Sequence, residues 1–335
     1  MRSVFMKDRV LKFLSLGVIV SALIVFYRFK DELDRRTQLS ADYPCLSDLR
    51  SCGLYGALFV AVQWCFRLAM IPVGRTFIPR KPVWSREVWV AKVDRFTAAI
   101  YKLLVTLFGL VYLYLIIHKA NWYPTALGGT GSTANCWLDG FPFQPVDLDL
   151  KKFMLASVAF VVSDLFVILL KERRRPDFSE LVLHLLGTVS LLVFAYLANF
   201  IRIVSLVIMT HLICDVFVYS AKALVDTRLS GGALAYFPLL TVHVWFRLNV
   251  FSSTVLKSVL VEAPKVLAQE SRLAWAYISV MLCLSLLLHA YWGFVIVKIG
   301  LLLLTTGQSR DLQANLSAMD IRDEKNGSSI LKKKN

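Results

Sequence analysis

The chain has 335 residues, of which 57% are hydrophobic, with a formal net charge of +15 and a mean hydropathy of +0.61. This hydropathy excludes an ordinary soluble domain and predicts a membrane protein. The basic residues lie between apolar runs and in the tail, where they orient membrane spans and meet anionic lipid, so we predict no nucleic-acid partner.

Eight apolar runs have, or approach, the roughly 20 residues that a membrane-spanning helix needs. In chain order they are 11–27, 53–73, 98–117, 153–170, 181–199, 203–223, 236–257 and 278–299. The sequence therefore predicts an all-α fold, a polytopic membrane helical bundle with 7–8 transmembrane helices. Because the first run follows a basic start and lacks a small-residue cleavage site, we expect it to be a retained signal anchor.

We expect three parts along the chain. Residues 1–84 hold the signal anchor and an additional membrane span, residues 85–304 form the main helical domain, and residues 305–335 form a polar cytosolic tail. The tail ends in Lys332-Lys333-Lys334-Asn335, which resembles the dilysine retrieval signal of endoplasmic reticulum membrane proteins. A solvated basic tail is the alternative.

The charges of the loops predict the orientation. Loops 74–97 and 171–176 are rich in Lys and Arg, whereas loops 118–152 and 259–272 are poorer in them for their length. Under the positive-inside rule the first two loops and the C-terminus face the cytosol, and only the basic segment 28–52 departs from the pattern. We therefore predict a multi-pass protein of the endoplasmic reticulum membrane with a cytosolic C-terminus.

The six cysteines do not have the spacing of metal ligands, so we predict no metal site. Cys45, Cys52 and Cys136 lie in predicted loops and could form one disulfide if those loops face an oxidising lumen. The sequence does not say which two would pair.

The fifth and sixth runs contain three titratable residues: His184, His211 and Asp215. His211 and Asp215 are four residues apart and share one helix face. The turn between the runs centres near 199–202, about 16 residues after His184 and about 14 before Asp215, so antiparallel helices would bring the two to similar depth. A histidine beside a carboxylate can take a proton from an amine or attack a thioester. We predict these three residues to be catalytic in acyl transfer, while helix packing remains an alternative for each alone.

Polar residues in other predicted spans have simpler interpretations. Arg247 could pair with Asp215 or with the phosphates or carboxylate of a substrate. His243 precedes it by four residues and shares its face, which indicates a polar lining. We expect Asp164 to be a packing or lipid-interface residue and His289 to mark an interhelical contact.

Residues 177–222 resemble the Lag1p motif of ceramide synthases, inside the TRAM-Lag1p-CLN8 (TLC) domain. The matching residues are Asp177-Phe178, His184, Thr188, Asn199-Phe200-Ile201-Arg202, His211, Asp215 and Ser220-Ala221-Lys222. Phe246-Arg247-Leu248 and Leu288-His289-Ala290-Tyr291-Trp292 look like family motifs in the last two spans. The last-span match favours the ceramide synthases over the TRAM branch, whose members assist membrane insertion.

The resemblance implies a ceramide synthase-like sphingoid-base N-acyltransferase, an enzyme that transfers an acyl group from fatty acyl-CoA to (dihydro)sphingosine. It implies no bound cofactor, with acyl-CoA as co-substrate, and Asn199, Arg202 and Arg247 as substrate-binding residues. The implied partners are membrane lipid, the acyl-CoA and sphingoid base, and another ceramide synthase in a homo- or heterodimer.

Two positions depart from the family pattern. The second histidine of the family's pair is Leu185 here, and the first aspartate of its His-Asp-x-x-Asp is Leu212. A leucine supplies neither a proton nor a lone pair. The second hypothesis is therefore a catalytically weakened or inactive TLC-domain paralogue that binds lipid or regulates an active ceramide synthase.

Overall fold

The computed structural model of the chain describes residues 2–40, 43–82, 84–171, 173, 178–227 and 232–306. This part of the chain is helical and contains no strand, and eight of its helices are long and apolar enough to cross a membrane. The predicted polytopic helical bundle is confirmed. Asp177, most of the basic loop 171–176 and the dilysine tail lie outside the described residues.

Seven of the predicted runs fall on one helix each, and the run 236–257 falls on the seventh helix and the helical segment that continues it. The helices are α1 (Arg2–Leu39), α2 (Arg50–Phe77), α3 (Arg86–Ile117), α4 (Leu148–Lys171), α5 (Phe178–Leu197), α6 (Ile201–Leu224), α7 (Gly232–Val242) and α8 (Arg272–Thr306). After α7 the chain continues without a break as two π-helical segments, η4 (His243–Leu256) and η5 (Ser258–Glu262). Several helices are longer than their apolar runs because polar turns extend them. At the start of α3, for example, the Ser85 side chain caps the helix by accepting a hydrogen bond from the Val88 amide.

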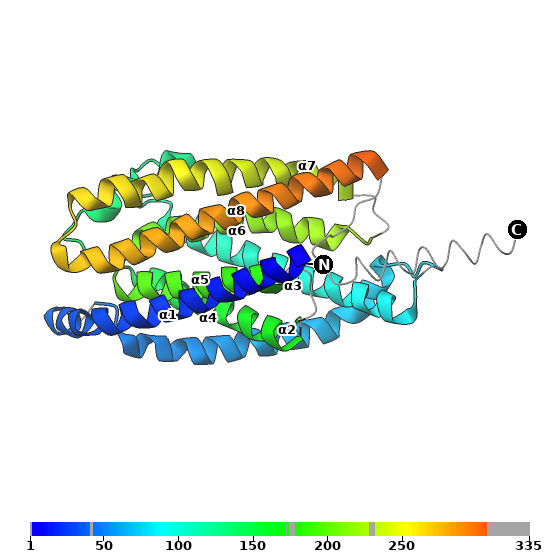
Figure 1. Cartoon of the computed structure of the whole chain (residues 1–335), viewed down its shortest axis with the longest axis horizontal. Coiled ribbons are helices and arrows are strands. Elements are labelled where there is room, and N and C mark those ends of the chain that lie inside the picture. The colour runs from blue at the N-terminus through cyan, green and yellow to red at the C-terminus, as the bar shows by residue number, and fades with distance from the viewer. Residues whose placement is uncertain are drawn as a thin grey trace, which may run out of the picture.

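Helices α5 and α6 lie at the centre of the bundle but have different neighbours. Helix α5 packs against α1, α4 and α8, whereas α6 packs against α3, α7 and η4. Figure 1 shows the helices lying along one long axis, with α8 beside the α7–η4 helix. Helix α8 contacts both α5 and η4, and η4 packs against α6, so α8 lies close to both central helices.

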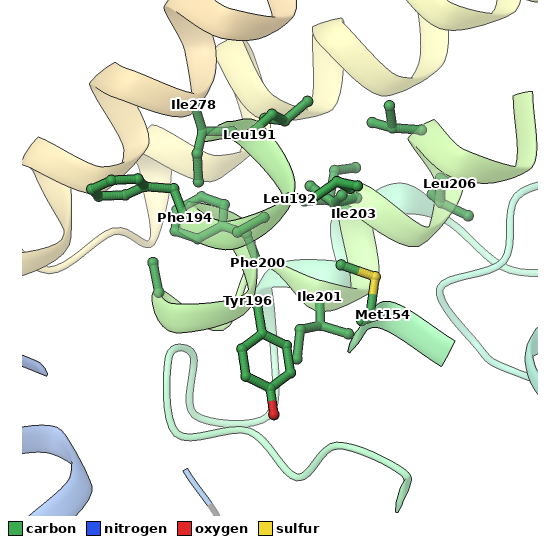
Figure 2. Close-up of a cluster of buried hydrophobic side chains, with 14 of the residues drawn as sticks. Met154, Leu191, Leu192, Phe194, Tyr196, Phe200, Ile201, Ile203, Leu206 and Ile278 are labelled. Atoms are coloured by element: carbon green, nitrogen blue, oxygen red, sulfur yellow. The ribbon is translucent and has the colours of Figure 1, made fainter. Parts of the chain in front are cut away.

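The turn between α5 and α6 forms where the sequence predicted it. Asn199 adopts a left-handed conformation with φ of 60°, which asparagine tolerates better than most residues. Phe200 and Ile201 follow it and are almost fully buried. Figure 2 shows these side chains packed with Phe194 and Met154 in the apolar cluster beneath the turn.

Residues 119–147, which join α3 to α4, cover this turn, and we call them the cap loop. Its Trp137 and Phe141 form an edge-to-face cluster with Phe200, with ring centroids 5.1–5.6 Å apart. The Trp137 indole donates to the Ser258 hydroxyl of η5 at 2.9 Å, and Thr133 donates to Glu262 at 2.9 Å. The cap loop is thus fixed to the turn and to η5.

The disulfide that the sequence left open is not formed in this structure, in which all six cysteines are free. Their thiols have separate surroundings. The Cys45 thiol contacts Asp48 at 3.1 Å, the Cys52 thiol donates to the Leu155 carbonyl at 3.4 Å, and Cys136 is buried within the cap loop.

An ion cluster fastens the far end of α6 to α3. Asp226, just after α6, accepts from Lys92 at 2.9 Å and from Arg95. Lys92 is only 2% exposed, and its ammonium lies 4.4 Å from the centroid of the Trp84 ring. Burial alone would raise the pKa of the Asp226 carboxyl, but Arg95 and Lys92 outweigh it and hold this pKa below its usual value.

Replacing Asp226 by asparagine is expected to lower the free energy of unfolding by about 2 kcal/mol at neutral pH, since two buried cations lose their partner. A carboxylate with a lowered folded-state pKa stabilises the fold above its unfolded pKa of about 3.9, and this stabilisation is lost as pH falls through the folded pKa. Denaturant titrations of purified protein at several pH values measure the effect.

The matched control is Asp149→Asn, because Asp149 and Lys152 form an exposed ion pair at 3.3 Å. We expect this change to lower stability by less than about 0.5 kcal/mol. Equal losses for the two variants would contradict the role of the Asp226 cluster.

Candidate functional site

Four of the chain's five histidines gather in the interior of the bundle. They are His184 of α5, His211 of α6, His243 of η4 and His289 of α8. The fifth, His118, caps the end of α3. We call the four interior residues the histidine cluster. Among the described residues, no group of three or more His, Cys, Asp or Glu side chains has the arrangement of a metal site.

His211 and His289 form the core of this cluster. Their Nε2 atoms are 3.0 Å apart, and their ring centroids are 4.8 Å apart. The Nδ1 of His211 lies 2.8 Å from the Val207 carbonyl, one turn earlier in α6. The Nδ1 of His289 lies 3.2 Å from the Arg247 carbonyl. Each ring is therefore oriented by a backbone carbonyl, and each points its second nitrogen at the other ring.

An ion pair lies one helical turn from His211. Arg247 is 6% exposed and donates from Nη2 to the Asp215 carboxylate. The same Nη2 lies 3.5 Å from the His211 carbonyl. Of the two partners that the sequence left open for Arg247, the structure gives Asp215. The pair keeps a carboxylate charged beside the histidine cluster, where an unpaired charge would be very costly.

The helical segment η4 carries His243 and Arg247 to this place. Every fourth residue of this stretch is buried: His243, Arg247, Phe251, Val255 and Val259. Residues four apart are neighbours on a helix surface, so these five line the side of the segment that packs into the bundle. His243 then lies between α6 and α8, with Nε2 3.0 Å from the His289 carbonyl and Nδ1 3.8 Å from the Cys214 thiol.

His184 joins the cluster through α8. Its ring meets Trp292 edge-on, with centroids 4.7 Å apart. Trp292 follows His289 by three residues, so the two lie on one face of α8. The next residue back, Tyr291, donates to Glu180 of α5 at 3.2 Å. Among the described contacts, no hydrogen bond or ion pair joins His184 to Asp215, which pairs with Arg247, and the ring contact of His184 comes from α8 rather than α6.

Asn199 and Arg202 lie at the cap loop, about 15 residues along α5 from His184, or roughly 22 Å. The Asn199 amide donates to the carbonyls of Pro142 at 2.6 Å and Gln144 at 3.2 Å. Arg202 donates to the Asp139 carboxylate at 3.0 Å. These contacts assign both residues to holding the cap loop, and their substrate-binding role stays a prediction.

Three residues considered from the sequence lie next to the site. Asp164 of α4 accepts from Lys102 of α3 at 2.7 Å, so this acid forms an interhelical ion pair. Leu185 is buried. Leu212 lies against α3, since a Cβ at Gly109 would meet both of its δ-methyl groups at 3.8 Å. The Leu212 side chain therefore packs towards α3.

Comparison with known proteins decides the family. Residues 94–298, more than half of the chain, match the sequence model described as the TLC domain. The chain belongs to the TLC-domain family. This TLC domain includes every member of the histidine cluster together with the Asp215–Arg247 pair.

Relatives with a TLC domain include several ceramide synthases. Ceramide synthase hyl-2 of Caenorhabditis elegans is 21% identical over 286 residues, covering 81% of this chain and 84% of the relative. Ceramide synthase LOH2 of Arabidopsis thaliana is 29% identical over 164 residues, covering 48% and 55%. Ceramide synthase 5 of Homo sapiens is 25% identical over 185 residues, covering 55% and 46%. These similarities show a ceramide synthase-like family and a multi-pass membrane protein.

The sequence underestimated one residue of this TLC domain. His289 was expected only to mark an interhelical contact, yet it contacts His211 directly. The sequence held a signal for this role of His289, because His289 and Trp292 are three residues apart and share one face of α8. In the structure their rings contact two different histidines, His211 and His184. Choosing those partners required knowing that α8 packs against α5 and η4.

Proposed function

We propose that this protein is a sphingoid-base N-acyltransferase, which joins the acyl group of fatty acyl-CoA to the amine of (dihydro)sphingosine. The observation that carries the proposal is the contact of His211 with His289 beside the Asp215–Arg247 ion pair. Family membership supports it, since relatives across most of the chain are ceramide synthases.

The chemistry follows from how His211 is held. The Val207 carbonyl fixes the ring and leaves Nε2 as the reactive nitrogen. An amine must lose a proton to attack a thioester, and Nε2 is suited to accept it. Asp215 offsets positive charge that develops near His211, and Arg247 keeps Asp215 ionised and in place. His184, against Trp292, would meet substrate on the α5 side.

The position of the histidine cluster in the bilayer determines how the substrates would reach it. The histidine cluster lies within helices long enough to span a membrane, so the sphingoid base would approach with its chain in lipid. His184 is seven residues into α5, at the end of the bundle opposite the cap loop. We infer that this end faces the cytosol, where acyl-CoA is found, in an endoplasmic reticulum membrane with the C-terminus on the same side.

The second candidate function is a lipid-binding or regulatory partner of an active ceramide synthase, favoured by Leu185 and Leu212. The surroundings of Leu212 weaken this candidate. Its methyl groups lie against Gly109 of α3, whereas the ring nitrogens of His211 contact Val207 and His289 rather than position 212. Leu185 remains the stronger argument for reduced activity, because it immediately follows His184 on α5.

The test measures N-acyl product from purified protein in liposomes that contain dihydrosphingosine, after acyl-CoA is added outside. We expect wild type to form product and Leu185→His to form it at least about tenfold faster, because the second imidazole adds a proton acceptor. Leu186→His, which places an imidazole on the adjacent face of α5, is the matched control and should not raise the rate.

The regulatory candidate predicts a different result. Wild type and Leu185→His would then both make no product, and wild type would change the rate of an active ceramide synthase reconstituted in the same liposomes. That pair of outcomes would overturn the enzyme proposal.

A further inference from the structure

The hydrogen bonds of the His211–His289 pair fix where its protons lie. A carbonyl oxygen only accepts, so each Nδ1 that faces one must carry a hydrogen. This applies to His211, whose Nδ1 faces Val207 at 2.8 Å, and to His289, whose Nδ1 faces Arg247 at 3.2 Å. Thr210 does not change the assignment, because its hydroxyl donates to the same Val207 carbonyl at 2.7 Å.

Two neutral rings with hydrogen on Nδ1 have a bare lone pair on each Nε2. At a separation of 3.0 Å, two lone pairs facing each other would repel. One additional proton between the Nε2 atoms turns this repulsion into a charge-assisted hydrogen bond, which is stronger than a neutral one. The observed separation is that of a hydrogen bond.

We propose that His211 and His289 share one proton between their Nε2 atoms, and that losing and regaining this proton is the acid–base step of the site. The resting pair carries one positive charge, and neither Nε2 is free. When the proton leaves, the lone pairs repel, the rings separate and Nε2 of His211 becomes available to substrate. His289 thereby becomes a second proton-holding residue.

The groups around the pair are two further histidines and one ion pair. The titratable and charged neighbours are Arg247, His184 and His243, with Asp215 one turn along α6. His243 donates from Nε2 to the His289 carbonyl, which leaves its Nδ1 to accept from the Cys214 thiol, so this ring is neutral. Asp215 balances Arg247, and the shared proton is then the single net charge of the cluster.

The catalytic part of the inference rests on the proposed function. A sphingoid base arrives as an ammonium ion, whose N–H bond breaks while the electron pair stays on nitrogen. The proton passes to Nε2 of His211 and is shared with His289. The neutral amine attacks the thioester carbon, the carbon–sulfur bond breaks, and the thiolate takes the second amine proton to leave as a thiol. The pair must release its own proton to solvent before it takes the ammonium proton, and accepting that proton returns it to the resting state with one shared proton.

The shared proton can be tested without activity. Wild-type protein labelled with ¹⁵N-histidine in lipid nanodiscs should give one far-downfield proton that correlates with the Nε2 of both rings. His211→Gln and His289→Gln should each abolish it, and His118→Gln should leave it unchanged. A spectrum of two neutral rings, with hydrogen on the Nε2 of only one of them, would overturn the proposal. If a variant fails to fold, the wild-type spectrum alone decides between these outcomes.

The kinetic test uses the pH dependence of product formation. Glutamine at 289 still donates to Nε2 of His211 but cannot hold the proton, so we expect kcat to fall by about tenfold while KM for acyl-CoA stays unchanged. The acidic limb of the profile should also move to lower pH, since His211 alone holds the proton less tightly. An unchanged profile in His289→Gln would assign His289 a purely structural role.

The two tests separate this inference from the proposed function. If the shared proton is found in a protein that makes no N-acyl product, the shared-proton proposal stands and the proposed acyltransferase function is refuted. Product formation without a shared proton would refute the pair alone.

Discussion

Replacing His211 by alanine is expected to lower the rate of N-acyl product formation at least about 1000-fold, because the change removes the imidazole whose Nε2 contacts the His289 ring and which lies one turn from Asp215. The fold should tolerate the change, since the α5–α6 turn and the cap loop lie more than two helical turns away. Initial rates with saturating acyl-CoA and dihydrosphingosine measure the effect.

His118→Ala is the control for this experiment. His118 caps α3, and its described contacts are with its own helix: two carbonyls at 3.0 and 3.2 Å and the Tyr114 ring. Its loss should therefore leave the rate within about twofold of wild type. A His211→Ala protein that retains a tenth or more of the wild-type rate would remove this histidine from the reaction.

The largest effect on stability is expected from Arg247→Met. This change leaves the Asp215 carboxylate without its cation in the membrane interior, and breaking a buried ion pair costs about 3–5 kcal/mol. Resistance to unfolding in detergent, measured as Tm or as a denaturant midpoint, should therefore fall sharply. Activity should be lost at the same time.

The double variant Asp215→Leu/Arg247→Met separates the two roles of the pair. Removing both charges also removes the desolvation penalty, so most of the lost stability should return. Activity should not return, because no carboxylate remains beside His211. A double variant that is as unstable as Arg247→Met would show that the ion pair is not the source of the loss.

The eight membrane helices and the α5–α6 turn could be predicted because both depend on local sequence. An apolar run of sufficient length has few alternatives to a spanning helix, and Asn199 suits the left-handed turn at which the two helices join. The shared face of His211 and Asp215 followed in the same way from a spacing of four residues.

The contacts between distant segments could not be predicted from local pattern. The sequence suggested that α5 and α6 would bring His184 to Asp215, but α8 supplies the partners of His184 and His211. Arg202 and Asn199 look like site residues in a linear motif, yet the cap loop, more than 50 residues earlier, uses both.

The most direct test of the account is detection, by mass spectrometry, of N-acylated dihydrosphingosine made by purified wild-type protein in liposomes free of other enzymes. The account predicts product that requires acyl-CoA, carries the acyl chain supplied and disappears in His211→Ala. A correctly folded wild-type protein that forms no product with any acyl-CoA, or a product that persists unchanged in His211→Ala, would contradict it.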